Sequence, residues 1–147
     1  ALPIWVVVFG KQAEQYASLF PFPIYPMNYV SNEKELVDIY NAVDLYVTPS
    51  LQDNLPNTIV EAMACGIPCV GFNVGGIPQM IDHLHNGYVA EYQSAKDLAN
   101  GIRWTLTEGE YDNLSEEACR KALSSYSESI ISMRYIDIYN KITGSHA

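Results

Sequence analysis

Two carboxylates stand eight positions apart in the stretch "LQDNLPNTIVEAMACG", residues 51–66. Glu61 is the one charged residue in the apolar run "TIVEAMA", and Asp53 precedes it across a proline. An ionised carboxylate is rarely buried without a partner, because removing it from water is costly in free energy. Glu61 therefore either pairs with a cation or faces a cleft in which a ligand binds.

The second possibility can be given a chemical form. A helix is predicted to begin near Asn57, and the N–H groups of its first turn favour an anion such as a phosphate. Glu61 lies about one turn further along, roughly 6 Å at 1.5 Å per residue, where a carboxylate suits a ribose diol. Asp53 could hold another hydroxyl-bearing part of the same ligand. These residues suggest a sugar nucleotide; the alternative is that Glu61 forms an ion pair and Asp53 only caps the helix or turns the loop.

The elements that must position these residues are short apolar strands alternating with helices. Strands are predicted at 4–10, 44–50, 68–76 and 88–92, with an irregular edge strand at 22–30, and helices at 11–20, 31–43, 57–64, 77–84, 94–108, 115–125 and 127–142. The run "IWVVVFG" is typical of a strand buried on both faces. The alternation predicts an α/β fold with a Rossmann-like parallel sheet and flanking helices. Ligands bind beyond the carboxyl ends of such strands, where loops 50–57 and 73–77 are expected.

Composition restricts the classes of function. The 147 residues carry a formal charge of −9, which argues against nucleic acid or an anionic membrane as the primary partner. We find no run of about 18 apolar residues that would predict a membrane anchor. Cys65, Cys69 and Cys119 are interpreted as small core residues in a reducing, cytoplasmic compartment. No His or carboxylate cluster has the spacing of a metal site, so we expect no metal.

The block 49–91 resembles the nucleotide-sugar-binding segment of retaining glycosyltransferases of the GT-B fold, family GT4, the glycosyl transferases group 1. That family reads P-S-x-x-E-G-F-G-x-x-x-x-E-A-M-A-x-G-x-P-V-V, then a glycine pair and an N-G turn, where this chain has "PSLQDNLPNTIVEAMACGIPCVGFNVGG" and "NG". The runs "IWVVVFG", "PMNYV", "LVDIYNAVDLYVTPS" and "SYSESIISMRYIDIYNKI" resemble further pieces of the same half, in the expected order. The resemblance implies the carboxy-terminal half of a GT-B fold. Residues 1–126 would form a nucleotide-sugar-binding domain, incomplete at its start, and 127–147 its closing helix and tail.

The resemblance also assigns roles to residues. The two glutamates of the family's E-x7-E signature correspond to Asp53 and Glu61, our catalytic candidates. Glu61 would hold the ribose hydroxyls, and Asp53 would contact the donor sugar or its phosphate environment. The backbone from Asn54 to Thr58 would meet the phosphate and sugar, and the segment 27–30 the base. The candidate donor-binding residues are Tyr29, Val30, Asn54, Leu55, Asn57, Thr58 and Glu61.

The chain departs from the family pattern at three places. Its first carboxylate is Asp53, one methylene shorter, and Asn54-Leu55-Pro56 replaces G-F-G. Pro56 cannot donate an N–H group, so contact with the sugar is the weaker expectation. The family's basic Gly-Arg…Lys-Gly pair precedes the strand with which this chain begins.

The implied function is donor binding in a retaining, metal-independent glycosyltransferase that needs no cofactor and assembles a surface polysaccharide or glycolipid. Its donor would be a nucleotide-diphosphate sugar, and its partner the missing amino-terminal acceptor-binding domain, through which it would lie at the membrane periphery in the cytoplasm. The fragment alone is expected to be inactive, with the apolar stripe from Ile131 to Ile142 folded back on the domain or paired in a weak homodimer. The alternatives are a non-catalytic α/β nucleotide-binding module and a sugar-nucleotide epimerase of the same overall fold.

Overall fold

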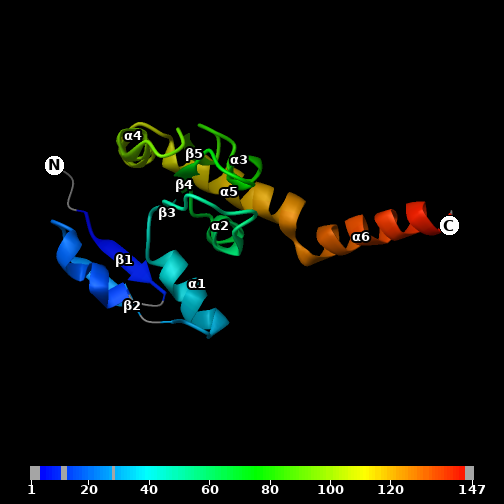
Figure 1. Ribbon diagram of the computed structural model, residues 1–147, viewed down its shortest axis with the longest axis horizontal. Helices are drawn as coiled ribbons and strands as arrows, with labels where there is room; N and C mark the ends of the chain where they lie inside the picture. Colours follow the sequence, from blue (N-terminus) through cyan, green and yellow to red (C-terminus); the bar gives the residue numbers. More distant parts are fainter. Residues whose placement is uncertain (1–3, 11–12, 28, 145–147) are drawn as a thin grey trace. The chain divides into compact units, whose positions relative to one another are not determined.

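The structure is a computed structural model that describes residues 4–10, 13–27 and 29–144 (Figure 1). The chain forms two compact units, Ala1–Val43 and Asp44–Ala147. Each unit contains one sheet, and in both sheets the strands run parallel. This combination of parallel strands and helices confirms the predicted α/β class.

The first unit holds a two-stranded sheet. Strand β1 (Val6–Phe9) pairs with β2 (Ile24–Met27), and helix α1 (Glu33–Asn41) follows. The side chain of Asn32 caps α1, because its Oδ1 accepts a hydrogen bond from the N–H of Lys34 at 2.9 Å.

Two expectations for this unit are wrong. The segment predicted as an α-helix over 11–20 is a 3-10 helix over Ala13–Leu19, with residues 11 and 12 outside the described part of the chain. The N–H of Ala13 bonds to the carbonyl of Gly10, and this i to i+3 spacing is that of a 3-10 helix. Strand β1 is half-buried rather than buried on both faces, and among the described residues only β2 pairs with it.

The second unit is built on a three-stranded sheet in the order β3-β4-β5. These strands are Tyr46–Thr48, Cys69–Phe72 and Gly87–Ala90. The register places Val70 of β4 beside Val47 of β3 and beside Tyr88 of β5. Every residue of β4 is buried, as expected for the central strand of a parallel sheet.

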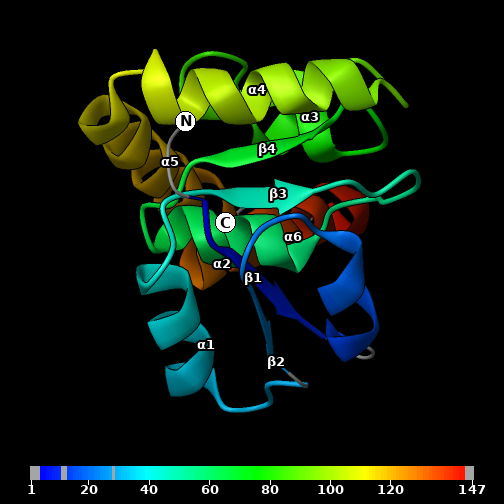
Figure 2. The ribbon, with the colours of Figure 1, turned by 90° about the vertical axis from the view of Figure 1, so that its left-hand side faces the viewer.

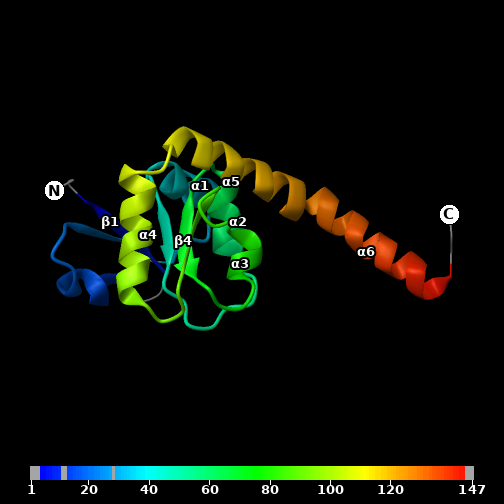
Figure 3. The same ribbon diagram turned by 90° about the horizontal axis from the view of Figure 1, so that it is seen from above.

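Helices cover both faces of this sheet. Figure 3 shows α2 (Asn57–Ala64) and α4 (Ala95–Thr107) on opposite sides of β4. Helix α5 (Tyr111–Tyr126) packs against α2, and the contact is close where a Cβ added at Gly66 would stand 2.8 Å from Ser115 Oγ. The sequence predicts this helix over 115–125, and in the structure it begins four residues earlier, at Tyr111.

Helix α3 is shorter than predicted. It spans Ile77–Met80 instead of 77–84, and Ile81 is already extended. The side-chain Oδ1 of Asn86 accepts a hydrogen bond from the N–H of Asp82 at 2.9 Å. Because this N–H is used here, it is not available to continue the hydrogen bonding of the helix. The local turn therefore ends α3.

The three cysteines are free thiols, and only Cys69 is fully buried. Burial raises the pKa of the Cys69 thiol far above its usual range, so this side chain is an unreactive part of the core. Cys65 and Cys119 are half-buried, and the Sγ of Cys119 lies 3.6 Å from the carbonyl oxygen of Ala64. The prediction of core packing is confirmed for Cys69 and holds only in part for the other two.

Helix α6 (Glu128–Thr143) follows α5 after a single extended residue, Ser127. None of its residues is buried, and Ile142 is 76% exposed. The stripe from Ile131 to Ile142 therefore does not fold back on the domain in this structure, and its pairing with another copy of the chain stays a prediction. Within the described residues, no helix combines the length and the apolar character needed to cross a bilayer. The predicted division after residue 126 falls at the end of α5 and stays a prediction.

Candidate functional site

The loop between β3 and α2, together with α2 itself, carries six of the eight predicted site residues. The loops that leave β3 and β4 lie at the carboxyl edge of the sheet (Figures 2 and 3). They touch through their backbones: a Cβ added at Gly75 would stand 1.6 Å from the carbonyl oxygen of Asp53, and one at Gly76 only 1.9 Å from that of Asn54. The two loops that the sequence places at this edge are thus in direct contact.

The charges of both predicted carboxylates affect the pKa of one phenol, that of Tyr46 at the start of β3. The hydroxyl of Tyr46 bonds to Thr58 Oγ1 at 2.8 Å. Burial raises the pKa of Tyr46, the charges of Glu61 and Asp53 act in the same direction, and the hydrogen bond with Thr58 opposes them. Thr58 is therefore the hydrogen-bond partner of the Tyr46 hydroxyl, and the charges of Glu61 and Asp53 act on the same group more weakly. The sequence analysis missed Tyr46, because nothing in the spacing of "DLYVTPS" signals a partner twelve residues away.

Exposure divides the predicted residues into two groups. Asp53, Thr58 and Glu61 are half-buried, whereas Asn54, Leu55 and Asn57 are exposed. The half-buried residues can be shielded from water while they contact a ligand. The exposed ones are available to a ligand mainly through the backbone.

The amino end of α2 has the electrostatics expected of an anion-binding helix terminus. Its N-cap residue is Pro56, which makes no side-chain capping bond, and its first turn holds no acidic residue. Asp53 is therefore not the cap of this helix. The partial positive charge of the first turn is left for another anion to use.

Tyr29 and Val30 belong to the unit Ala1–Val43. Tyr29 is 72% exposed and Val30 is half-buried. The preceding residue, Asn28, lies outside the described part of the chain. Their contact with a nucleotide base stays a prediction.

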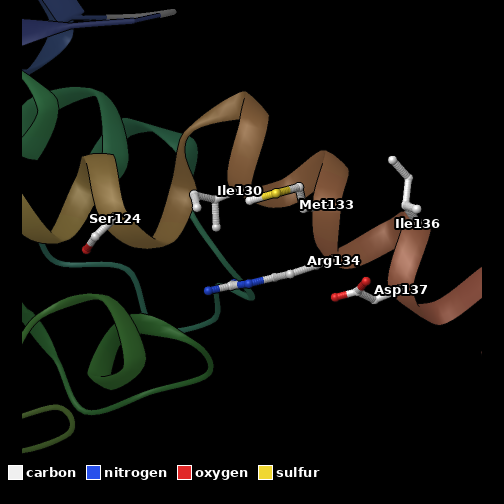
Figure 4. Close-up of a pocket in the computed structure, with 6 residues that line it drawn as sticks. All are labelled: Ser124, Ile130, Met133, Arg134, Ile136 and Asp137. Atoms are coloured by element: carbon white, nitrogen blue, oxygen red, sulfur yellow. The ribbon is translucent and has the colours of Figure 1, made fainter. Parts of the chain in front are cut away.

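A separate hollow of about 400 Å³ lies where α5 meets α6 (Figure 4). Its lining residues are Ser124, Ile130, Met133, Arg134, Ile136 and Asp137. Figure 4 shows the side chain of Arg134 reaching back toward α5. None of the predicted site residues lines this hollow.

Comparison with known proteins identifies the sequence pattern. The family described as "Glycosyl transferases group 1" matches residues 26–122. The chain is 30% identical over 117 residues to the N,N'-diacetylbacillosaminyl-diphospho-undecaprenol alpha-1,3-N-acetylgalactosaminyltransferase of Campylobacter jejuni, covering 79% of this chain and 31% of that protein. It spans about a third of the length of the curated relatives it matches.

Two solved structures have the same fold. Sucrose-phosphate synthase from Thermosynechococcus elongatus matches with a TM-score of 0.80 at 18% identity, over 98% of this chain and 39% of that one. The Anabaena protein HepE in complex with UDP matches with a TM-score of 0.78 at 19% identity, over 92% of this chain and 40% of that one, and was also solved with UDP-glucose. These matches confirm the predicted GT-B type of fold.

Proposed function

The chain belongs to the glycosyl transferases group 1 family, and we propose that it is the donor-binding part of a retaining glycosyltransferase. The observation that carries the proposal is the backbone contact of Asp53 and Asn54 with Gly75 and Gly76 at the carboxyl edge of the sheet, next to the amino end of α2, which no side chain caps. Half-buried acceptors next to an electropositive helix terminus suit a ligand that combines an anion with sugar hydroxyls.

Each part of this site has a task in the proposed reaction. The first turn of α2 faces the diphosphate, Glu61 accepts hydrogen bonds from the ribose hydroxyls, and Asp53 accepts them from the transferred sugar. Positioning of the donor and stabilisation of the departing diphosphate are the main contributions to rate. Neither task uses a metal or another cofactor. Both tasks can be carried out by hydrogen-bond acceptors and a helix dipole whose positions are set by the fold.

The proposed donor is a uridine diphosphate sugar. UDP and UDP-glucose are the ligands of the HepE structures. The Campylobacter jejuni relative is named for the transfer of N-acetylgalactosamine to a diphospho-undecaprenol acceptor. By analogy we place this protein in the assembly of a surface polysaccharide or glycolipid on the cytoplasmic side of a membrane, with an acceptor-binding domain supplied by the rest of the polypeptide.

The test is a titration of the full-length protein with the glucose derivatives of UDP, GDP and ADP, followed by a transfer assay. We expect UDP-glucose to be preferred, with micromolar affinity, and the anomeric configuration of the sugar to be kept in the product; a preference for the GDP or ADP derivative would contradict the proposed base. Binding without transfer to any acceptor would favour a non-catalytic nucleotide-binding module. Interconversion of the donor sugar would favour an epimerase, and failure to bind any of the three would refute the proposal.

A further inference from the structure

The loop that carries Asp53 follows β3 and is held from the end of β5, the strand on the other side of β4. The hydroxyl of Tyr92, just beyond β5, donates a hydrogen bond to the carbonyl oxygen of Leu51 at 3.2 Å, across 41 positions of the sequence. The side-chain amide of Gln93 donates in turn to the Tyr92 hydroxyl at 3.3 Å. Gln93 adopts a left-handed backbone conformation, with φ of 61°. The Gln93 amide and the Tyr92 hydroxyl thus link the turn after β5 to the loop that carries Asp53.

On another side, the same loop is held by the backbone of Gly75 and Gly76. A side chain at either position would collide with the carbonyl oxygen of Asp53 or Asn54. The loops after β3, β4 and β5 are therefore connected to one another at the carboxyl edge of the sheet. Asp53 lies two residues beyond the carbonyl that Tyr92 holds.

We propose that Tyr92 is a positioning residue for Asp53. It acts through the main chain of Leu51, and the inference rests on the proposed function in so far as Asp53 contacts the donor sugar. The segment 51–55 contains no helix or strand to order it, so its order depends on tertiary contacts of this kind. Removing the hydroxyl should let the loop open more often and misplace the carboxylate.

The first test measures the loop itself, in the full-length protein without ligand. Tyr92→Phe removes only the hydroxyl, and amide hydrogen exchange in a peptide covering 51–55 should rise roughly 2- to 12-fold, the factor that corresponds to one neutral hydrogen bond. Tyr126→Phe is the matched control, because the Tyr126 hydroxyl donates to the carbonyl of Gln79 at the same distance of 3.2 Å. The control should speed exchange near Gln79 and leave the loop unchanged. Unaltered loop exchange in Tyr92→Phe would overturn the inference.

The second test separates positioning from a general structural role. Tyr92→Phe should weaken binding of UDP-glucose by roughly 2- to 12-fold while leaving binding of UDP unchanged, since only the sugar meets Asp53. In a protein that already carries Asp53→Ala, Tyr92→Phe should weaken UDP-glucose binding no further, because the two residues act as one unit. Full additivity of the two losses would overturn positioning through Asp53.

The outcomes also distinguish this inference from the proposed function. If Asp53→Ala leaves UDP-glucose binding intact, the role of Asp53 in the proposed function is wrong, and the role of Tyr92 falls with it. If Asp53→Ala weakens binding but Tyr92→Phe does not, the proposed function stands and only the inference about Tyr92 is wrong.

Discussion

Replacing Glu61 with alanine should weaken nucleotide binding without unfolding the protein. Glu61 is half-buried on α2, and buried Ala62 and Met63 follow it. Hydrogen bonds from ribose hydroxyls to this carboxylate would contribute about 1.5–3 kcal/mol, which corresponds to roughly a 12- to 140-fold change in Kd. Alanine has the highest helix propensity of all residues, so the helix itself should not be weakened.

The assay pairs calorimetric titration of UDP with thermal unfolding of the same full-length variants. Glu116→Ala serves as the control, because Glu116 is an exposed carboxylate on α5. We expect the control to match the wild type in both measurements, and Glu61→Ala to change only the titration. Normal UDP binding by Glu61→Ala would refute the assignment. A clear fall in Tm would show instead that Glu61 belongs to a structural ion pair.

Three further predictions concern the donor site and the parts of the protein around it. Asp53→Ala in the full-length enzyme should lower turnover more than affinity for the nucleoside diphosphate, and equal losses would contradict its place beside the sugar. Chelation should leave activity intact, because the proposed mechanism uses no metal; recovery of lost activity on adding manganese or magnesium would show otherwise. The chain spans 31% of the length of the Campylobacter jejuni relative, so the isolated chain should transfer no sugar. It should bind donors only in the millimolar range if two charge-assisted phosphate contacts of about 1.5–3 kcal/mol each come from another part of the polypeptide, as the family pattern implies. A micromolar Kd for the fragment, measured by calorimetry, would mean that the site is misplaced.

The sequence predicts the elements whose signals are local. Helix α2 begins at Asn57, as the position of Pro56 indicates, and the buried run around Cys69 becomes the central strand β4. Helix α4 begins beyond Ser94, whose Oγ accepts a hydrogen bond from the N–H of Asp97 at 3.2 Å, as the capping spacing predicts. In each case the residues that decide the structure lie within a few positions of one another.

The predictions fail where distant contacts or competing turns decide. The early end of α3 depends on the side chain of Asn86, which apolar periodicity does not register. The exposed stripe of α6 shows that an apolar face predicts burial only where something is present to cover it. The hydroxyls of Tyr46 and Tyr92 bond to residues 12 and 41 positions away in the sequence, and no local sequence pattern indicates such partners.

The backbone contact between the two loops has a consequence for how such a site can evolve. Gly75 and Gly76 meet main-chain oxygens of Asp53 and Asn54, and a contact with the main chain is indifferent to the side chains of the loop. Asn54 and Leu55 are exposed, so selection can exchange their side chains while the loop keeps its place. The glycines have no such freedom. The side chains of this loop can therefore change while Gly75 and Gly76 must stay glycine.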